Sequence, residues 1–377
     1  MASDEVRRSP VMSATPAPSP AALWASRPAA DRAVRNSDCD DEGMSIPAES
    51  HGPSDAQWRC PHGVSFVALR RHDGGWATGR AAGELASAHE GRRGVTDSEA
   101  APGRRDAAGG PGAAGGSGGL FYRFASPGPD APPMVHVHGF AISGDVLLPT
   151  AAKLADSFAT YVPDLPGHGR SAGPPTPLGL YELGDALVGF LDDLGIERAT
   201  FVGNSMGCPV ISRLAIRHPD RIDRAIMVAP AGGPSQRPLS RALWNMSLDG
   251  FLEPPSLLPV ALRAYSRFGT LNAWRMFVLM TTIQSVRMLR DLDLPMLFVT
   301  GGRDPLLPSE ARMQAMREAF ETRGNVTAVR LPKAAHAINF SHPDELAAII
   351  RAYMADPALT DRSGIPDSAQ VLLTARP

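Results

Sequence analysis

Three side chains in the second half of the chain have the types and spacing of a nucleophile, an acid and a base. Ser205 lies at the centre of the sequence G-N-S-M-G at residues 203–207, between a short apolar run and a helical pattern. In such a strand–turn–helix the central residue adopts a strained backbone, and the helix N-terminus favours negative charge. That environment suits a serine whose attack creates an oxyanion. A glycine-rich turn with a capping serine is the alternative, because the motif also occurs by chance.

A serine nucleophile needs a base, and the base needs an acid that orients it. Asp304 follows the apolar run 296–300, and His336 follows the run 326–331, so both lie just past predicted strands. The chain order serine, acid, histidine is one of the orders in which this triad occurs. His342 is the alternative base, but its position at the start of the last predicted helix favours a capping role.

An oxyanion must be met by two N–H groups aimed at one point. The amide of Met206, directly after the nucleophile, is the first candidate. The amide of Phe140, in the loop after a His-Gly pair, is the second. We expect His138 to hold this loop and His168, in a surface turn near the site, to have a structural role. Cys208 could be a second nucleophile, but its place in a helix favours a small buried thiol.

The elements that would position these residues alternate between strands and helices. The predicted strands cover residues 120–124, 134–138, 161–163, 200–202, 224–229, 296–300 and 326–331, and the predicted helices cover 146–158, 180–194, 206–218 and 345–354. This alternation predicts an α/β protein with a mostly parallel, doubly wound sheet and helices on both faces. In such sheets the ligand binds at the carboxyl ends of the strands, where the three candidate residues lie.

Between residues 232 and 293 the alternation breaks, and the texture is helical with no strand pattern. An insertion that leaves the carboxyl end of a strand lies over the site, so we interpret it as a helical cap. A set of ordinary packing helices is the alternative. About half of its large apolar side chains should form the cap's own core. The others should face the triad and bind substrate, the candidates being Trp244, Phe251, Trp274, Met276 and Phe277.

Residues 1–118 have the composition of a disordered or low-complexity extension, rich in Pro, Ala, Gly, Ser, Arg and Asp. Such a segment buries too little apolar surface to offset its ordering entropy. The stretch 64–69 could form a strand, but no partner for it is apparent, and an interaction tail is the alternative reading of the segment. The α/β core is expected in 119–231 and 294–356, and 357–377 is expected to be a C-terminal tail.

Composition limits the classes of function. The chain has 377 residues, a net charge of −2 and 43% hydrophobic residues, so it can form a full core. Acids and bases are mixed, which predicts neither a nucleic-acid footprint nor a membrane-surface patch, and no apolar run could span a bilayer. Three cysteines and the lack of a secretory signal predict a reducing compartment, the cytoplasm. We expect a small-molecule substrate and no metal or organic cofactor, and leave the oligomeric state open.

Residues 120–355 resemble the α/β-hydrolase superfamily. The matching motifs, in order, are H-G-F at 138–140, D-L-P-G-H-G-R-S at 164–171, the turn at 203–207, Asp304 and His336. The resemblance implies the α/β-hydrolase fold with Ser205, Asp304 and His336 as its triad. The form G-N-S-M-G is similar to the branch that hydrolyses carbon–carbon bonds in aromatic ring-cleavage products.

The chain departs from that branch at two positions. F-A-I-S at 140–143 follows the His-Gly pair where the branch has a glycine-rich loop, and Ala337 follows the histidine where the branch has tryptophan. These differences favour a serine hydrolase that acts on a small or medium ester through an acyl-enzyme. Carbon–carbon bond hydrolysis of a diketone acid is one alternative. A non-catalytic ligand-binding protein with the same fold is the other.

Overall fold

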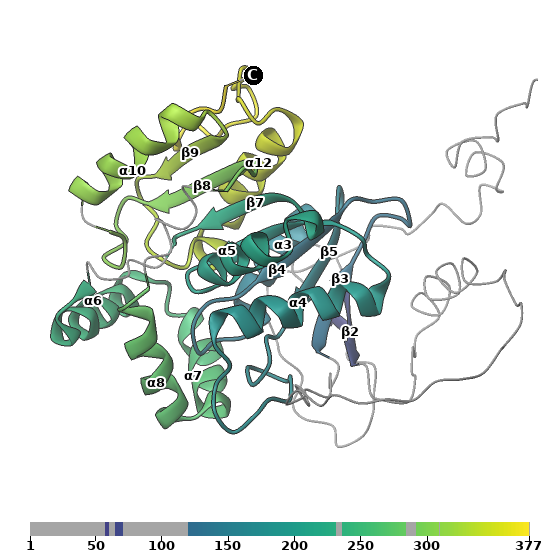
Figure 1. Ribbon diagram of the computed structural model, residues 1–377, viewed down its shortest axis with the longest axis vertical. Coiled ribbons are helices and arrows are strands. Elements are labelled where there is room, and N and C mark those ends of the chain that lie inside the picture. Colours follow the sequence, from purple (N-terminus) through teal and green to yellow (C-terminus); the bar gives the residue numbers. More distant parts are fainter. Residues whose placement is uncertain are drawn as a thin grey trace, which may run out of the picture. The chain divides into compact units, whose positions relative to one another are not determined.

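The computed structural model describes residues 57–59, 65–70, 120–230, 236–283, 292–308 and 310–376, all within one compact unit, 43–377. They form a sheet of ten strands in the order β1-β2-β3-β5-β4-β6-β7-β8-β9-β10 (Figure 1). The strands are β1 (Gln57–Arg59), β2 (Ser65–Arg70), β3 (Phe121–Ala125), β4 (Pro133–Val137), β5 (Ala159–Pro163), β6 (Ala199–Asn204), β7 (Ile222–Val228), β8 (Met296–Gly301), β9 (Val326–Leu331) and β10 (Gln370–Leu373). The neighbouring strands β5, β4, β6, β7, β8 and β9 all pair in parallel, which confirms the predicted fold class.

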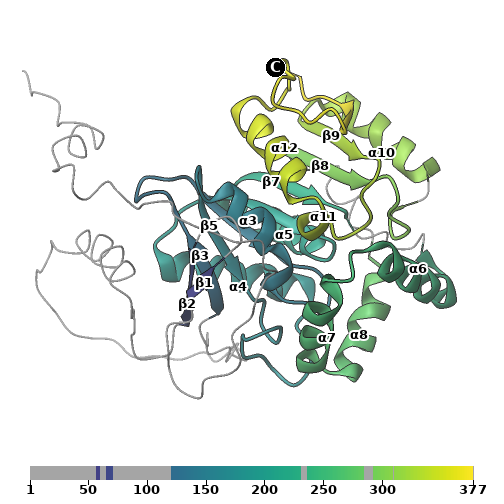
Figure 2. The same ribbon diagram turned by 180° about the vertical axis from the view of Figure 1, so that it is seen from behind.

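Helices cover both faces of this sheet. Figure 1 shows α4 and α5 on the near face, and Figure 2, seen from behind, shows α3, α11 and α12 on the other. The helices that flank the sheet are α3 (Leu148–Leu154), α4 (Leu180–Leu194), α5 (Gly207–Arg217), α10 (Glu310–Arg323), α11 (Ile338–Ser341) and α12 (Pro343–Ala355), with short 3-10 turns η2 (Gly144–Leu147) and η3 (Pro219–Arg221). Because both faces are covered, β6 and β8 are buried at every residue, as their continuous apolar sequences require.

The spacing of the leucines in α4 determines which side of the helix packs inward. Its bounds agree with the predicted 180–194, and Leu183, Leu187 and Leu191, spaced four apart, are all fully buried. Side chains at this spacing lie on one face of a helix, so α4 packs that face against α5 and the sheet. Gly195 ends the helix with φ 66, a left-handed conformation that favours glycine.

Both edges of the sheet extend further than the sequence predicted. β2 pairs antiparallel with β3, with Val67 opposite Phe124, which provides the partner that the stretch 64–69 lacked. At the other edge β10, within the segment expected to be a tail, pairs antiparallel with β9. Apart from β1 and β2, the predicted extension 1–118, including Cys39 and Cys60, lies outside the described residues.

The insertion between β7 and β8 is helical in its described part, residues 236–283. It contains α6 (Leu239–Leu252), α7 (Leu257–Phe268) and α8 (Thr270–Met280), and no strand occurs in that range. The three helices lie beyond the carboxyl ends of the central strands (Figure 1). Neither these nor the other helices in the described ranges are long and apolar enough to cross a bilayer.

Candidate active site

Ser205 occupies the tight turn between β6 and α5 with φ 53, in the left-handed region that non-glycine residues rarely adopt. Two glycines make the turn possible. A Cβ on Gly203 would lie 2.8 Å from the Gly207 carbonyl carbon, and one on Gly207 would lie 2.2 Å from the Val137 carbonyl oxygen. The Ser205 amide donates to the carbonyl of Val228 at 3.0 Å, which fixes the turn to β7. The strained apex expected from the sequence is present.

His336 and Asp304 form a hydrogen-bonded pair in the loops after β9 and β8. The Nδ1–H of His336 donates to Asp304 Oδ2 at 2.7 Å, so Nε2 is left as the basic nitrogen. The side chain of Asp304 is fully buried, and its Oδ1 accepts from the Leu306 amide at 2.8 Å, which fixes the carboxylate. Asn204, directly before Ser205, donates to the His336 carbonyl at 3.5 Å. The structure therefore brings this pair to the turn that carries the serine.

The amides of Phe140 and Met206 have no hydrogen-bond acceptor in the described part of the chain. Met206 is the N-cap residue of α5. The loop that holds Phe140 lies beside the nucleophile, since a Cβ on Gly139 would be 3.2 Å from the Ser205 Cβ. Unpaired backbone N–H groups near a serine are the kind of donor that an oxyanion requires.

His138 holds the Phe140 loop, as expected. Its Nδ1–H donates to the Gly139 carbonyl at 2.9 Å, and its Nε2 accepts from the Leu165 amide at 2.9 Å. His168 differs from the expectation of a surface turn, because it is buried and stacks on Phe268 of α7 with ring centroids 4.2 Å apart. Burial lowers the pKa of His168 to about 3, so its ring is neutral. His168 thus packs the insertion against the 164–171 loop.

A buried ion cluster supports the same loops, and sequence reasoning missed it. Arg123 Nη1 contacts Asp164 Oδ1 at 2.8 Å, and its Nη2 contacts Asp145 at 2.6 Å. Asp164 also accepts from the amides of Gly144 and Arg170, at 2.7 and 2.9 Å. Burial by itself raises the pKa of Asp164, but the Arg123 guanidinium outweighs it and holds the pKa below its ordinary value. Removing one partner would leave an unpaired buried charge, which is strongly destabilising.

Two carboxylates at the C-terminal end of α6, one of them on its C-cap residue, contact the histidine loop. Asp249 Oδ1 accepts from the His336 amide at 3.3 Å, and Glu253 Oε1 accepts from the Ala337 amide at 2.5 Å. Burial raises the pKa of Asp249 to about 7 and also raises that of Glu253. Burial by itself lowers the pKa of His336, but the carboxylates of Asp304, Asp249 and Glu253 together raise it to about 9. The only sequence signal was two acids four residues apart within residues 236–283, which contain no other acid.

Helix α6 is also tied to the Asp304 loop. The buried Gln236 side chain donates through Nε2 to the carbonyls of Leu306 and Leu307, at 3.0 and 3.2 Å. Its Oε1 accepts from Asn245 Nδ2 at 2.7 Å, one turn before Asp249 on the same helix. The insertion therefore holds both loops that carry the acid and the histidine.

The five side chains that were predicted to contact substrate differ in how far they are buried. Met276 and Phe277 are buried, and the Phe277 ring lies 6.4 Å from that of Phe140, centroid to centroid. Tyr265 of α7 also meets Phe140, edge to face, at 5.9 Å. The other three predicted contacts are 69%, 88% and 47% exposed: Trp244, Phe251 and Trp274. Of these, Trp274 keeps a ring contact with Phe277, 5.9 Å between centroids.

The contacts of Cys208 and His342, the remaining candidates, fit structural roles. Cys208 is fully buried, its thiol donates to the Gly203 carbonyl at 3.3 Å, and burial raises its pKa far above the ordinary value. His342 is the N-cap residue of α12, and its Nδ1 meets Ser341 Oγ at 2.9 Å. No group of three or more His, Cys, Asp or Glu that could hold a metal occurs among the described residues.

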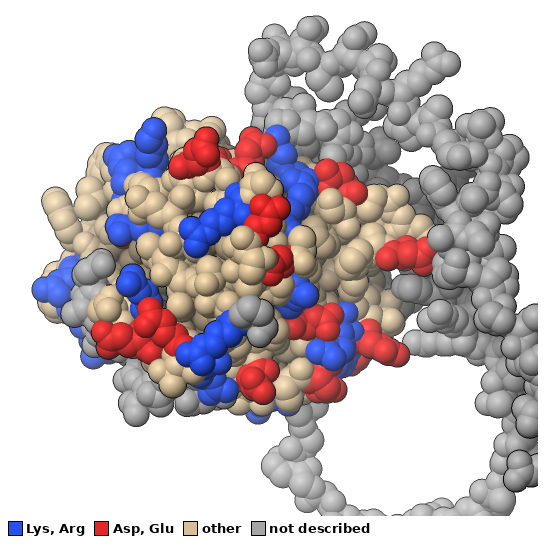
Figure 3. Space-filling view, turned by 90° about the horizontal axis from the view of Figure 1, so that it is seen from above, with Lys and Arg blue, Asp and Glu red and all other residues tan. Residues whose placement is uncertain are grey.

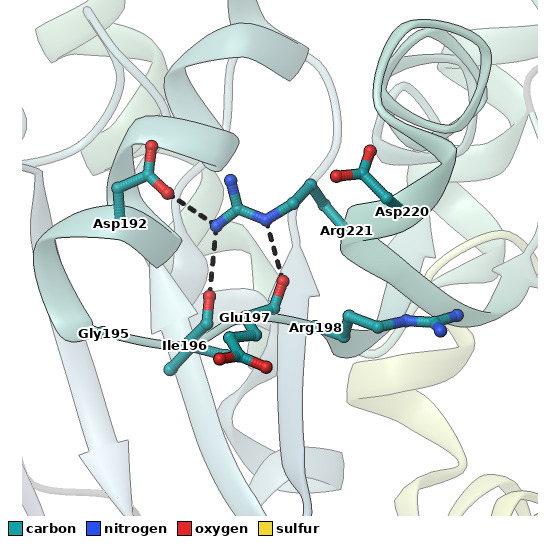
Figure 4. Close-up of a pocket in the computed structure, with 7 residues that line it drawn as sticks. All are labelled: Asp192, Gly195, Ile196, Glu197, Arg198, Asp220 and Arg221. Carbon is teal, nitrogen blue, oxygen red and sulfur yellow. Dashed lines mark hydrogen bonds and ion pairs between the residues drawn. The ribbon is translucent and has the colours of Figure 1, made fainter.

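A surface depression of about 460 Å³ lies apart from these residues, at the amino ends of β6 and β7 (Figure 4). Arg221 crosses it, donating through Nη2 to Asp192 at 2.6 Å and to the Ile196 carbonyl at 3.1 Å, and through Nε to the Glu197 carbonyl at 2.8 Å. These contacts satisfy the guanidinium and fasten the turn before β6. Ligands of parallel sheets bind at the opposite, carboxyl ends of the strands, so we assign this depression a structural role.

The chain is similar to known proteins in sequence and in fold. The sequence matches the alpha/beta hydrolase family over residues 134–349. It is 29% identical over 243 residues to the pimeloyl-[acyl-carrier protein] methyl ester esterase of Pectobacterium carotovorum, covering 56% of this chain and 89% of that protein. A shorter match, 35% identical over 114 residues, is to the dihydrolipoyllysine-residue acetyltransferase component of the acetoin cleaving system of Cupriavidus necator, and it spans 30% of each protein. The solved structure of a thermophilic esterase from Thermogutta terrifontis shares the fold, with a TM-score of 0.52 and 22% identity over 64% of this chain and 96% of that one.

Proposed function

Because the chain belongs to the alpha/beta hydrolase family, whose members similar to it include esterases, we propose that it hydrolyses a small or medium carboxylic ester through a serine acyl-enzyme. The observation that carries this proposal is the hydrogen-bonded pair of His336 and Asp304 beside the strained turn of Ser205. Such a pair provides the base and the orienting acid that a serine nucleophile needs. The fold alone would not determine the chemistry.

In the proposed reaction Ser205 Oγ attacks the ester carbonyl carbon while its proton passes to His336 Nε2. Asp304 keeps the other ring proton on Nδ1 and stabilises the imidazolium. The imidazolium then gives its proton to the leaving alcohol oxygen as the carbon–oxygen bond breaks, and the acyl group remains on Ser205. Water, activated by the same imidazole, attacks the acyl-enzyme and releases the acid and the free serine.

The negative charge of each tetrahedral intermediate would be met by the amides of Phe140 and Met206. Backbone donors that are already in place need no reorganisation during the reaction, and one such donor contributes a factor of roughly a hundred to a thousand in kcat. The His138 contacts hold the first donor in position, and the start of α5 holds the second.

The charge near His336 supports an uncharged substrate. Asp249 and Glu253 contact the backbone of the histidine loop, so a bound carboxylate would meet like charges there. A diketone acid carries such a carboxylate, whereas a simple ester does not. The aromatic group of Phe140, Tyr265 and Phe277 is suited to the apolar part of an ester. We therefore favour ester hydrolysis over carbon–carbon bond hydrolysis.

The test is a panel of acyl esters of increasing chain length, assayed beside a vinylogous diketone acid. We expect turnover of esters, a loss of at least about a thousandfold in Ser205→Ala, and full turnover in the matched control Ser157→Ala, which changes an exposed serine in a loop. Turnover of the diketone acid alone would replace the proposal with carbon–carbon bond hydrolysis. Binding of these compounds without turnover would indicate a ligand-binding protein.

A further inference from the structure

The insertion has an unusual outer surface. Eleven large hydrophobic side chains among the described residues are exposed, and nine of them belong to α6, α7 and α8. Exposed hydrophobic residues that are scattered singly need no explanation, but a concentration of them in one segment marks an interaction surface. We call the outward sides of these three helices the insertion face.

Helix α6 has its apolar side outward. Its inward side carries Asn245 and Asp249, which bond to Gln236 and to the His336 amide. Trp244, Leu248 and Phe251, spaced by four and three residues, share the opposite side and are 69%, 39% and 88% exposed. An amphipathic helix of a water-soluble domain normally turns its apolar stripe inward. The stripe of α6 is therefore available to a partner outside the fold.

Helices α7 and α8, which pack against each other, continue the pattern. Leu258 and Leu262, four residues apart on α7, are exposed at 59% and 60%, whereas the other side of the helix is buried. On α8, Leu271 is exposed at 59% and Phe277 is buried. Trp274, exposed at 47%, lies between them, and its ring centroid is 5.9 Å from that of Phe277. Both helices thus carry apolar side chains on the packed side and on the exposed side.

The charges of the insertion face have one sign. Its exposed charged side chains are arginines, and the two acids of residues 236–283 are Asp249 and Glu253, which are directed to the histidine loop. The face of the protein shown in Figure 3 differs, because acidic and basic side chains are interleaved there. The exposed arginines lie on or just before the three helices: Arg237, Arg241, Arg263, Arg267 and Arg275.

We propose that the insertion face binds the surface of a bilayer that contains anionic phospholipids, with its leucine, phenylalanine and tryptophan side chains among the upper acyl chains and its arginines on the lipid phosphates. Helices that lie in a membrane interface combine an apolar side rich in Trp, Phe and Leu with basic residues, and anionic lipids attract those basic residues. The whole-chain charge of −2 hid this pattern, because the fold separates the basic insertion from the acids elsewhere.

Charge also distinguishes the bilayer from a second copy of the chain. A two-fold contact through this face would bring two positively charged surfaces together, and like charges would oppose it. An anionic lipid surface instead pairs with each arginine. The inference concerns binding alone and does not depend on the chemistry at Ser205.

The test is sedimentation of the full chain with vesicles of phosphatidylcholine alone or of phosphatidylcholine with phosphatidylglycerol. We expect binding to the vesicles with phosphatidylglycerol, weakened by added salt because exposed charges are screened. Leu262→Ser and Phe251→Ser should each weaken binding by about tenfold or more, since each removes a side chain from the acyl region. Ile216→Ser, which changes an exposed apolar residue of α5 outside the insertion, is the matched control and should bind like the unmodified chain.

Circular dichroism of each variant shows whether it is folded before its binding is interpreted. The proposal is wrong if the chain binds neither vesicle, if it binds both equally, or if Leu262→Ser and Phe251→Ser bind as well as the Ile216→Ser control. Sedimentation velocity without lipid provides a further check. A dimer that Leu262→Ser dissociates would make the face a protein interface and would overturn the proposal.

Discussion

The Asp249→Asn substitution tests the electrostatic coupling between the insertion and the histidine. Burial lowers the pKa of His336 when considered alone, and Asp304, Asp249 and Glu253 together raise it to about 9. Asparagine keeps an oxygen that can accept from the His336 amide, so the 3.3 Å contact can survive while the negative charge is lost. The substitution therefore changes the charge beside the imidazolium with little change in shape.

The direction and size of the effect follow from this arrangement. Loss of a carboxylate destabilises the imidazolium, so the pKa of His336 falls and its neutral, basic form appears at lower pH. Asp249 has a pKa of about 7, so it is charged in the range where His336 titrates. A nearby opposite charge moves a pKa by roughly one to three pH units, and the partial exposure of Asp249 favours the lower figure. A fall of about one pH unit raises the neutral fraction at pH 8 about fivefold.

The assay is the pH dependence of kcat/KM for a neutral ester, whose acid limb reports the base of the free enzyme. We expect this limb to lie about one pH unit lower in Asp249→Asn. Asp192→Asn, which removes an acid near the amino ends of β6 and β7, is the matched control and should leave the limb in place. An acid limb that stays fixed or moves to higher pH in Asp249→Asn would refute the assigned coupling.

Three further predictions concern the fold and the insertion. Gly207→Ala should lower the melting temperature and activity together, because its Cβ would meet the Val137 carbonyl oxygen at 2.2 Å, and overpacking of this kind costs about 1–3 kcal/mol; an unchanged thermal transition would contradict the close approach. Phe277→Ala should change the ratio of kcat/KM for long and short esters by roughly tenfold, whereas the exposed Trp244→Ala should not; equal shifts in both would place the specificity elsewhere. Deleting residues 1–70 removes β1 and β2 and should lower the melting temperature measured by calorimetry, whereas an unchanged value would show that this edge adds no stability.

The sequence was sufficient for the parallel core and for the placement of the site candidates. Strand β9 and helix α4 have the predicted bounds, because continuous apolar runs and four-residue spacing are local signals. The strained backbone of Ser205 was predicted from the G-x-S-x-G turn, and the structure shows it with φ 53. Asp304 and His336 could be paired in advance because both follow parallel strands, whose carboxyl ends share one edge of the sheet.

The features that escaped prediction depend on contacts between distant segments. The Asp249 carboxylate and the His336 amide are 87 positions apart, and no local pattern connects them. The same holds for the Arg123–Asp164 pair and for β10. Phe251 was expected in the cap's own core or facing the triad and is instead 88% exposed, because the sequence does not determine which side of α6 packs inward.

The central claim is that Ser205 is the nucleophile, with His336 as its base. Its most direct test is reaction with a fluorophosphonate, followed by mass spectrometry of the intact protein and of its peptides. We predict one adduct, on Ser205, that is absent in Ser205→Ala and forms at least about a hundredfold more slowly in His336→Ala, because the imidazole activates the hydroxyl. An unmodified protein, an adduct on another residue, or labelling that His336→Ala leaves at full rate would contradict the claim.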